Sequence, residues 1–439
     1  MNDTVARNLT LNDAITDVET RYVAAHPKSK ARYERALKSM PGANTRTVLH
    51  YDPFPVTVVK GEGAIVTDLD GHRYRDLLGE YTAGLYGHSN PEILRALNEA
   101  LKSGLVLGGP NEYEAKLAEL MCARFPAVEL IRFCNSGTEG NMMCVSLARA
   151  ITGKRKILGF HGGYHGGLMA FPGEGTSPMN ASEEVVLTDY NDPEAARQAI
   201  IENRDELAAV ILEPMMGGGG CIPAEPDFLG VLREESEKHG AFLIFDEVMT
   251  SRLAPGGMQE RTGVRPDLVA FGKYLGGGVS FGAFGGREDL MSRLDPSKPE
   301  ALVHSGTFNN NVLTMAAGLA GLEKVLTPEA TIRLNEAGDR LRVRMQEAAD
   351  ARDIPAQVMG LGSMICVHFQ DQPIHRPADA EATPPATRKL LQLELNLKGF
   401  YLSRRGFMSL CLPLTDRDYD DFVAAFEEFL DENNTVLSG

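Results

Sequence analysis

Short apolar segments alternate with amphipathic stretches through the middle of the chain. The apolar segments cover residues 130–134, 156–160, 184–189, 208–214, 241–248 and 267–273. The stretches between them include residues 139–152, 193–204 and 226–239, which predict helices. Strands that are apolar along their whole length are typical of a parallel sheet covered by helices. The pattern therefore predicts an α/β fold, with a mainly parallel sheet and helices on both faces.

The two ends of the chain have a different pattern. The N-terminal pattern predicts a helix over residues 11–39 and extended segments over 55–78, with a hairpin turn at Asp70-Gly71. The C-terminal pattern predicts helices over 312–326, 329–352 and 416–431, strands near 363–369 and 399–412, and a Pro-rich loop over 370–386. We expect residues 1–75 and 312–439 to form a smaller α+β domain beside a large domain of residues 76–311.

The charge balance of the chain argues against one class of partner. Its 439 residues include 44 Lys and Arg against 60 Asp and Glu, a formal net charge of −16. Such a chain repels a phosphate backbone, so we expect no nucleic-acid partner. The chain has no run of about eighteen apolar residues, so we also expect no membrane partner.

The cysteines and histidines indicate a reducing compartment and no metal site. The six Cys form no CxxC pair, and the polar first residues do not resemble a signal peptide, so we expect a cytoplasmic protein. HExxH is missing, and the ten His show no spacing typical of zinc ligands. We therefore expect no bound metal.

Glycine is over-represented and concentrated after the predicted strands. The chain has 45 Gly, about one residue in ten against a typical ~7%. Many lie in residues 162–167, 217–220 and 276–278. Ligands of open α/β sheets bind beyond the carboxyl ends of the strands. We interpret these glycines as positions where the backbone lies close to a cofactor. The alternative is that they form flexible connections between the predicted elements.

Polar groups follow the first two predicted strands. Ser136-Gly137-Thr138 stands at a helix start, where free N–H groups attract a phosphate, although an ordinary helix cap has the same pattern. Tyr164 lies in a Gly-rich loop that can hold its ring flat against a planar ligand, or that simply turns. Each signal alone is modest.

Charged groups follow later strands. Glu213 and Asp246 end apolar segments, and Lys273 follows another. Buried carboxylates need a cation, and a buried lysine amine is costly unless it is neutral or covalently bound. For each residue alone, an ordinary ion pair or a lysine that reaches solvent is the simpler interpretation. Together these positions supply a phosphate anchor, a stacking ring, a carboxylate for a ring cation and an amine for an aldehyde, which pyridoxal phosphate requires.

The same strand ends carry five motifs, FCNSGTEGN, GGYHGG, ILEP, LIFDEV and FGKYLGGG. Their order and spacing resemble the class III, fold-type I pyridoxal-phosphate aminotransferases, and the resemblance covers nearly the whole chain. It implies pyridoxal 5′-phosphate as cofactor, bound in the large domain, and transaminase activity. One departure is Gly140, where the family usually has Ala; it lowers helix propensity by ~1 kcal/mol but removes no functional group.

The resemblance implies a role for each cofactor-binding residue. Lys273 is similar to the catalytic lysine that binds the cofactor aldehyde and moves a proton, and Asp246 is similar to the acid that pairs with the ring nitrogen. The other implied contacts are Ser136, Gly137 and Thr138 at the phosphate, Tyr164 above the ring, Val248 below it, and Glu213 nearby. Thr307 resembles the threonine that completes the phosphate site from the neighbouring subunit, which implies a homodimer with shared active sites.

Two groups within the family compete. MPGANTRTVLHYDPFP, GEYTAGLYGHS, DEVMTSRLAP, SGTFNNNV and SRRGFMSLCLPLT resemble the β-amino-acid aminotransferases of the β-phenylalanine type. Residues 272–286 share their glycine pattern with glutamate-1-semialdehyde 2,1-aminomutase. The Pro-Val-Arg and Ser-x-Phe-Glu sequences usual in the aminomutase are replaced here by NTRT at 44–47 and SRRG at 403–406. We favour the aminotransferase, with the aminomutase or a pyridoxal-phosphate-dependent amino acid racemase as alternatives.

The resemblance also implies the substrate contacts. Arg46 and Arg405 are similar to two carboxylate-binding arginines, since a guanidinium pairs bidentately with a carboxylate; in the simpler interpretation both are surface arginines. We expect Arg46 to bind the β-amino acid donor and Arg405 the distal carboxylate of 2-oxoglutarate, with pyruvate as the other candidate keto acid acceptor. Glu80, Tyr81 and Met249 are expected to line the pocket of this ping-pong transaminase.

Overall fold

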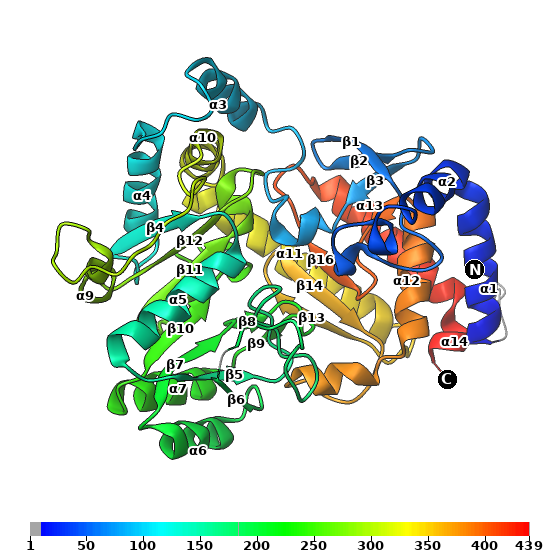
Figure 1. Cartoon of the computed structure of the whole chain (residues 1–439). Coiled ribbons are helices and arrows are strands. Elements are labelled where there is room, and N and C mark those ends of the chain that lie inside the picture. Colours follow the sequence, from blue (N-terminus) through cyan, green and yellow to red (C-terminus); the bar gives the residue numbers. More distant parts are fainter. Residues whose placement is uncertain (1–9, 183, 439) are drawn as a thin grey trace.

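The centre of the molecule is a seven-stranded sheet, seen in the computed structural model, which describes residues 10–182 and 184–438 (Figure 1). The strands lie in the order β4-β12-β11-β10-β7-β5-β6. Their bounds are β4 (Leu130–Cys134), β5 (Lys156–Phe160), β6 (Glu184–Thr188), β7 (Leu207–Leu212), β10 (Phe242–Asp246), β11 (Leu268–Gly272) and β12 (Gly282–Gly286). All neighbours are parallel except β12, which is antiparallel to both β11 and β4. The predicted α/β fold with a mainly parallel sheet is confirmed.

Strand β12 is the strand of this sheet that the sequence pattern does not predict. It is rich in glycine because other backbone lies close beside it. A Cβ on Gly282 would lie 2.1 Å from the carbonyl oxygen of Ser136, and one on Gly286 would lie 2.2 Å from that of Asp267. Glycine in a local pattern indicates a turn, whereas here it marks close packing within the sheet.

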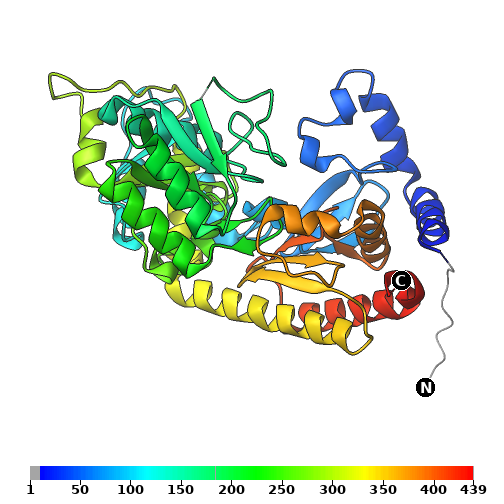
Figure 2. The same ribbon diagram turned by 90° about the horizontal axis from the view of Figure 1, so that it is seen from below.

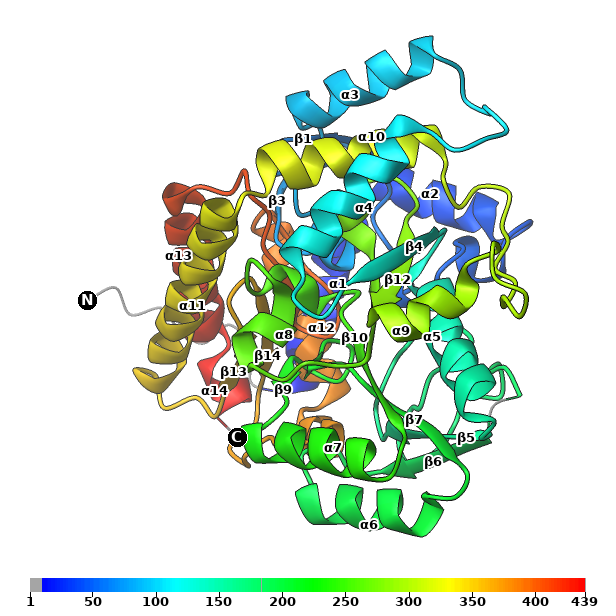
Figure 3. The same ribbon diagram turned by 90° about the vertical axis from the view of Figure 1, so that its left-hand side faces the viewer.

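Helices cover both faces of the sheet (Figure 3). Alternate residues of β7 belong to two different buried clusters. Ala209 and Ile211 pack with α5 (Gly137–Thr152), and Val210 and Leu212 pack with α6 (Pro193–Asn203) and α7 (Pro226–Lys238). Because both faces are buried, the strand is apolar along its whole length.

Two smaller sheets lie beside the large one, and one of them joins the two ends of the chain (Figure 2). One contains β1 (Val58–Glu62), β2 (Ile65–Asp68), β3 (Arg73–Asp76) and β15 (Phe400–Tyr401). The other contains β13 (Gln357–Leu361), β14 (Met364–His368) and β16 (Phe407–Ser409), and is packed against α11 (Pro328–Asp350), which in turn packs on α13 (Asp416–Glu432). β15 pairs in parallel with β3, so segments far apart in the sequence share one sheet. The domain bounds expected from the sequence stay a prediction.

The helices near the two ends differ from the predictions in three places. The helix expected over residues 11–39 is two helices, α1 (Leu11–Ala25) and α2 (Pro27–Ala36), because Pro27 has no N–H to continue α1. The helix expected over 312–326 is α10 (Val312–Ala320) followed by a π-helical turn over Gly321–Val325. The predicted loop over 370–386 ends where an unpredicted buried helix, α12 (Pro385–Leu397), begins.

The remaining helices complete the described chain. They are α3 (Pro91–Lys102), α4 (Glu112–Arg124), α8 (Gly257–Thr262), α9 (Glu288–Met291) and α14 (Asn434–Leu437), and β8 (Met215–Met216) pairs with β9 (Ile222–Pro223). Across residues 10–182 and 184–438, none of the helices combines the length and apolar character needed to cross a bilayer.

Candidate active site

Three charged side chains meet at the carboxyl edge of the large sheet. The parallel neighbours β7, β10 and β11 end at this edge, and Glu213, Asp246 and Lys273 stand at or directly after their last residues. The negative charges of Asp246 and Glu213 both act on the Lys273 amine. The structure therefore brings together the three charged groups that the sequence singles out.

Asp246 is 4% exposed and is held in a fixed orientation. Its Oδ2 accepts hydrogen bonds from Asn141 Nδ2 at 2.7 Å and from His165 Nδ1 at 2.8 Å. Its Oδ1 accepts one from the backbone N–H of Val248 at 3.0 Å. Because a carboxylate only accepts, these contacts fix the proton of His165 on Nδ1.

Asn141 and His165 are functional candidates that the sequence analysis missed. His165 directly follows Tyr164 in the Gly-rich loop, so its position there is a usable signal. Asn141 lies four residues after Gly137, one turn into α5, where side chains face the same side of a helix as the phosphate turn. Both residues are buried, and both contact the acid rather than the space where a ligand would lie.

Lys273 follows β11 in a strained backbone conformation. Its φ is +55°, in the left-handed region that costs a non-glycine residue about 1–2 kcal/mol. Burial lowers the pKa of Lys273 to about 8, even though Asp246 and Glu213 act in the opposite direction. A larger share of the amine is therefore neutral and nucleophilic near neutral pH than for an exposed lysine. Strain and a lowered pKa at one residue are typical of a functional site.

Glu213 lies beneath the Gly-rich loop. Its two carboxyl oxygens accept hydrogen bonds from the backbone N–H groups of Tyr164 at 3.2 Å and Gly217 at 3.1 Å. Burial and, to a smaller extent, the nearby charge of Asp246 together raise the pKa of Glu213 to about 7. The side chain therefore orients both loops that enclose the site.

The predicted phosphate turn stands at the start of α5. Ser136 is the N-cap, and its Oγ accepts a hydrogen bond from the N–H of Glu139 at 3.2 Å. A Cβ on Gly166 would lie 2.1 Å from Thr138 Oγ1, so the Gly-rich loop packs directly on this turn. The N–H groups at a helix start, aligned with the helix dipole, favour a phosphate.

Val248 lies between the turn and Lys273. A Cβ on Gly137 would come within 2.6 Å of Val248 Cγ2, and one on Gly272 within 3.1 Å of Val248 Cγ1. The ring of Tyr164, by contrast, is 55% exposed. The site therefore combines a helix start for a phosphate, an apolar side chain and an aromatic ring for a planar ring, a carboxylate for a ring cation and an amine for an aldehyde. This combination fits a phosphorylated, cationic ring that carries an aldehyde. The individual cofactor contacts stay predictions.

Arg46, Glu80 and Tyr81 form one cluster at the edge of the site. The Arg46 guanidinium forms an ion pair with the Glu80 carboxylate and lies 5.7 Å from the centre of the Tyr81 ring. The Tyr81 ring stacks on Phe407, with the ring centres 6.0 Å apart and the planes 4° apart. The Arg46 guanidinium is therefore held by the Glu80 carboxylate of the same chain and by the face of the Tyr81 ring.

Arg405 approaches the same region from the C-terminal part of the chain. Its Nη1 donates a hydrogen bond to the carbonyl of Gly218 at 3.1 Å. A Cβ on Gly218 would lie 3.8 Å from both Arg405 Nη1 and Tyr164 Cβ. Burial raises the pKa of Tyr81 to about 12, and the charges of Arg405 and Arg46 both oppose this rise. Tyr81 therefore lies within the electrostatic reach of both guanidinium groups.

Met249 lies on the apolar side of this pocket. A Cβ on Gly217 would come within 2.8 Å of Met249 Cε, and Met249 packs against the same buried cluster as Tyr81. The structure thus places the expected substrate residues next to one another. Their roles toward a substrate stay predictions.

The segment that carries Glu80 and Tyr81 is strained. Four consecutive residues, Gly79 to Thr82, have φ between +46° and +81°. Two contacts hold it: Tyr81 Oη donates to the carbonyl of Val48 at 3.1 Å, and Gly84 N–H donates to the carbonyl of Gly79 at 2.8 Å. Strain of this kind is typical of ligand-binding segments, and sequence patterns do not show it.

Thr307 lies in an exposed loop with apolar neighbours. Val303 is 88% exposed and Phe308 is 56% exposed. From the same loop, Asn309 Oδ1 accepts a hydrogen bond from Asn135 Nδ2 at 3.0 Å, directly before the phosphate turn. A single chain does not test whether Thr307 reaches a neighbour's site.

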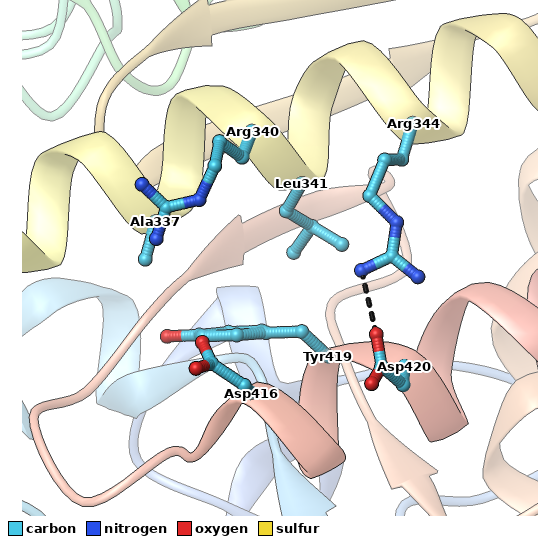
Figure 4. Close-up of a pocket in the computed structure, with 7 residues that line it drawn as sticks. All are labelled: Ala337, Arg340, Leu341, Arg344, Asp416, Tyr419 and Asp420. Atoms are coloured by element: carbon cyan, nitrogen blue, oxygen red, sulfur yellow. Dashed lines mark ion pairs between the residues drawn. The ribbon is translucent and has the colours of Figure 1, made fainter.

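A surface groove between α11 and α13 lies apart from these residues (Figure 4). It is lined by Ala337, Arg340, Leu341, Arg344, Asp416, Tyr419 and Asp420. Arg344 and Asp420 form an ion pair across it at 2.9 Å. None of the expected site residues lines this groove.

Comparisons with known proteins agree with the site. The family profile for class-III aminotransferases matches residues 48–430. The chain is 48% identical to the β-phenylalanine transaminase of Variovorax paradoxus over 427 residues, 97% of this chain and 98% of that protein. It is 38% identical to the glutamate-1-semialdehyde 2,1-aminomutase of Thermomicrobium roseum over 380 residues, 83% and 88% of the two chains.

Two solved structures match over nearly the whole chain. The crystal structure of the β-phenylalanine aminotransferase from Variovorax paradoxus has a TM-score of 0.96 at 48% identity and covers 98% of this chain and 99% of that one. A transaminase with PLP bound has a TM-score of 0.85 at 33% identity and covers 94% and 99%.

Proposed function

The chain belongs to the class-III aminotransferase family, and we propose that it moves the amino group of a β-amino acid of the β-phenylalanine type to 2-oxoglutarate or pyruvate. It is a pyridoxal-phosphate-dependent transaminase. The similarity to the Variovorax paradoxus β-phenylalanine transaminase supports the donor class. The proposal rests most on one observation, which is that Arg46 and Arg405 both act on Tyr81 at the edge of the Lys273 site.

Pyridoxal phosphate, when bound, supplies an aldehyde for the amino group and a protonated ring that withdraws electrons. The N-terminus of α5, with Ser136 and Thr138, binds the phosphate. Val248 and the ring of Tyr164 hold the two faces of the cofactor ring. Asp246, oriented by hydrogen bonds from Asn141 and His165, would hold the proton on the ring nitrogen.

Lys273 carries out the proton transfer. Its Nζ would hold the cofactor through the aldehyde, which would supply the site for the donor's amino group. The same Nζ would take the proton from the carbon that carries this amino group, which requires the unprotonated amine. Because burial lowers the pKa of Lys273 to about 8, a larger share of the amine is in this form near neutral pH than for an exposed lysine.

The two arginines serve two different substrates in a ping-pong cycle. A β-amino acid and 2-oxoglutarate place their carboxylates at different distances from the reacting carbon, so one cation does not fit both. Arg46 binds the carboxylate of the donor, and Arg405 binds the distal carboxylate of 2-oxoglutarate. Glu80, Tyr81 and Met249 shape the pocket between them.

We also propose a cytoplasmic homodimer in which Thr307 completes the phosphate site of the neighbouring subunit. The exposed apolar side chains beside Thr307 support this assembly, since such patches mark interaction surfaces.

A panel of purified-enzyme assays tests the function. β-Amino acids and α-amino acids are combined in turn with 2-oxoglutarate and pyruvate, and the glutamate or alanine formed is measured. We expect turnover with an aromatic β-amino acid and an absolute requirement for a keto acid. Conversion of glutamate-1-semialdehyde, or inversion of an amino acid, without any keto acid would instead support the aminomutase or the racemase.

A further inference from the structure

Two histidines and an aspartate meet where the junction of α1 and α2 contacts the β2–β3 hairpin. His26 lies between the two helices, Asp68 is the last residue of β2, and His72 lies in the hairpin turn. One possible ligand atom from each lies within 4.8 Å of the others, and no other such group occurs in the described part of the chain. None of the transaminase residues named above takes part.

The hydrogen bonds of His26 leave one ring nitrogen without a proton. His26 Nδ1 lies 2.7 Å from the carbonyl oxygen of Tyr22, which only accepts, so Nδ1 carries the proton. In the neutral ring, His26 Nε2 therefore presents a lone pair. Metal-binding histidines are commonly fixed in this way, by a backbone carbonyl on the other nitrogen.

The cluster lacks one positive charge or proton. The Tyr74 hydroxyl lies 2.8 Å from His26 Nε2 and 2.7 Å from Asp68 Oδ2. Both atoms are acceptors, and the hydroxyl has one proton to donate. One of these contacts therefore lacks a hydrogen unless His26 carries a second proton on Nε2 or a cation binds beside the two acceptors.

Asp68 supplies a buried negative charge for such a cation. It is 1% exposed, and among residues 10–182 and 184–438 it has no ion pair with a lysine or arginine. Its Oδ1 accepts hydrogen bonds from the backbone N–H groups of Gly71 and His72 at 2.7 and 2.8 Å.

Two of the three distances between the ligand atoms suit a tetrahedral metal ion, and all three atoms lie within 4.8 Å of one another. Bonds of about 2.0–2.1 Å to nitrogen and oxygen place neighbouring ligands about 3.3 Å apart. Asp68 Oδ2 lies 3.5 Å from His26 Nε2 and 3.0 Å from His72 Nδ1. The side chain of His72 is 43% exposed, so it gives a path from solvent and is free to adjust its rotamer.

We propose that His26, Asp68 and His72 form a binding site for a divalent late transition metal, with zinc as the ion these imidazole and carboxylate ligands fit best. Water takes the fourth position, and the Tyr74 hydroxyl then donates its proton to Asp68. The ion joins the α1–α2 junction to the β2–β3 hairpin and stabilises the N-terminal part of the fold.

Titration of the holoenzyme with zinc chloride tests the site by calorimetry and by thermal unfolding. We expect one tight zinc ion per chain and a higher Tm at saturating zinc. His72→Ala, at a half-exposed position compatible with folding, should weaken zinc binding at least about 10-fold and remove the Tm increase. His375→Ala is the matched control, because His375 is exposed, lies outside the cluster and pairs with Glu225 at 3.1 Å.

Cobalt(II) provides an independent readout, because tetrahedral cobalt gives visible absorption bands. These bands should appear with the wild-type protein and with His375→Ala, and should be missing with His72→Ala. Zinc binding that is absent from the wild type, or equally tight in His72→Ala and the wild type, would overturn the proposal. None of these measurements depends on transaminase activity.

Discussion

Asn141→Ala should weaken catalysis through Asp246 without removing any group expected to touch a substrate. The Asn141 amide donates one of the two side-chain hydrogen bonds to Asp246 Oδ2, at 2.7 Å, and His165 donates the other at 2.8 Å. Asp246 is 4% exposed, so water does not readily replace the lost donor. The carboxylate would then be less well stabilised opposite the ring nitrogen of the cofactor.

The size of the effect can be worked out from this contact. A hydrogen bond to a charged group contributes about 1.5–3 kcal/mol. If the lost stabilisation is expressed fully in the transition state, kcat/KM falls about 10- to 150-fold, since each 1.36 kcal/mol is a factor of ten. His165 still holds Asp246 Oδ2, so the smaller end of this range is expected.

The assay compares Asn141→Ala with a matched truncation. Asn396 is also buried, and its side-chain oxygen and nitrogen have no hydrogen-bond partner in the described structure. Asn396→Ala therefore removes a buried amide of the same size but no hydrogen bond to an acid. Initial rates over a range of donor concentrations give kcat/KM, and reconstitution of the apoenzyme gives the Kd for pyridoxal phosphate. Equal kcat/KM and Kd values for the two variants, within twofold, would refute the argument that Asn141 positions Asp246.

Four further predictions concern the same site and its surroundings. Lys273→Ala should abolish amino transfer, and no cofactor mass should stay attached after borohydride reduction; an attached cofactor would contradict the assignment. Cofactor uptake by the apoenzyme should speed up as pH rises and level off above about 8, because burial lowers the pKa of Lys273 to about 8 and only the neutral amine attacks an aldehyde; a rate still rising near pH 10 would count against this. Arg405→Ala should raise the KM for 2-oxoglutarate at least about 10-fold more than that for pyruvate, and equal changes would reject a contact with the distal carboxylate. Gly79→Ala should lower the free energy of unfolding by about 1–3 kcal/mol more than Gly63→Ala. Both glycines have positive φ, but only a Cβ on Gly79 would meet a backbone atom, at 2.5 Å. Equal midpoints of urea unfolding for the two variants would show that this contact relaxes.

The large sheet and the ends of its strands could be predicted because their signals are local. A strand buried on both faces must be apolar along its length, so the segment at 156–160 matches the strand β5 residue for residue. The groups of interest stand directly after such strands, and parallel strands place the residues after them at one edge of the sheet. Lys273 and Asp246 could therefore be assigned to one site from the sequence alone.

Secondary-structure predictions from local patterns failed where tertiary packing decides which element a residue belongs to. The glycines of β12 indicate a loop by composition, yet Gly282 is required because Ser136 backbone lies against it. The helix over residues 11–39 is interrupted by Pro27, and α12 was missed although it begins at Pro385, where the Pro-rich segment that indicated a loop ends. In each case the glycine or proline constrains the backbone, but the element that forms depends on which residues pack beside it.

The sequence by itself determined the fold class, the cofactor and the positions of the groups expected to bind it, because these follow from apolar periodicity and from residues that stand directly after strands. Only the tertiary structure decided which residues hold those groups in place. It placed Asn141 and His165 around Asp246, and it brought His26 to Asp68 although 42 residues separate them in the chain. No spacing rule reveals such pairs, because their members come from different elements and meet only when the sheets and helices pack.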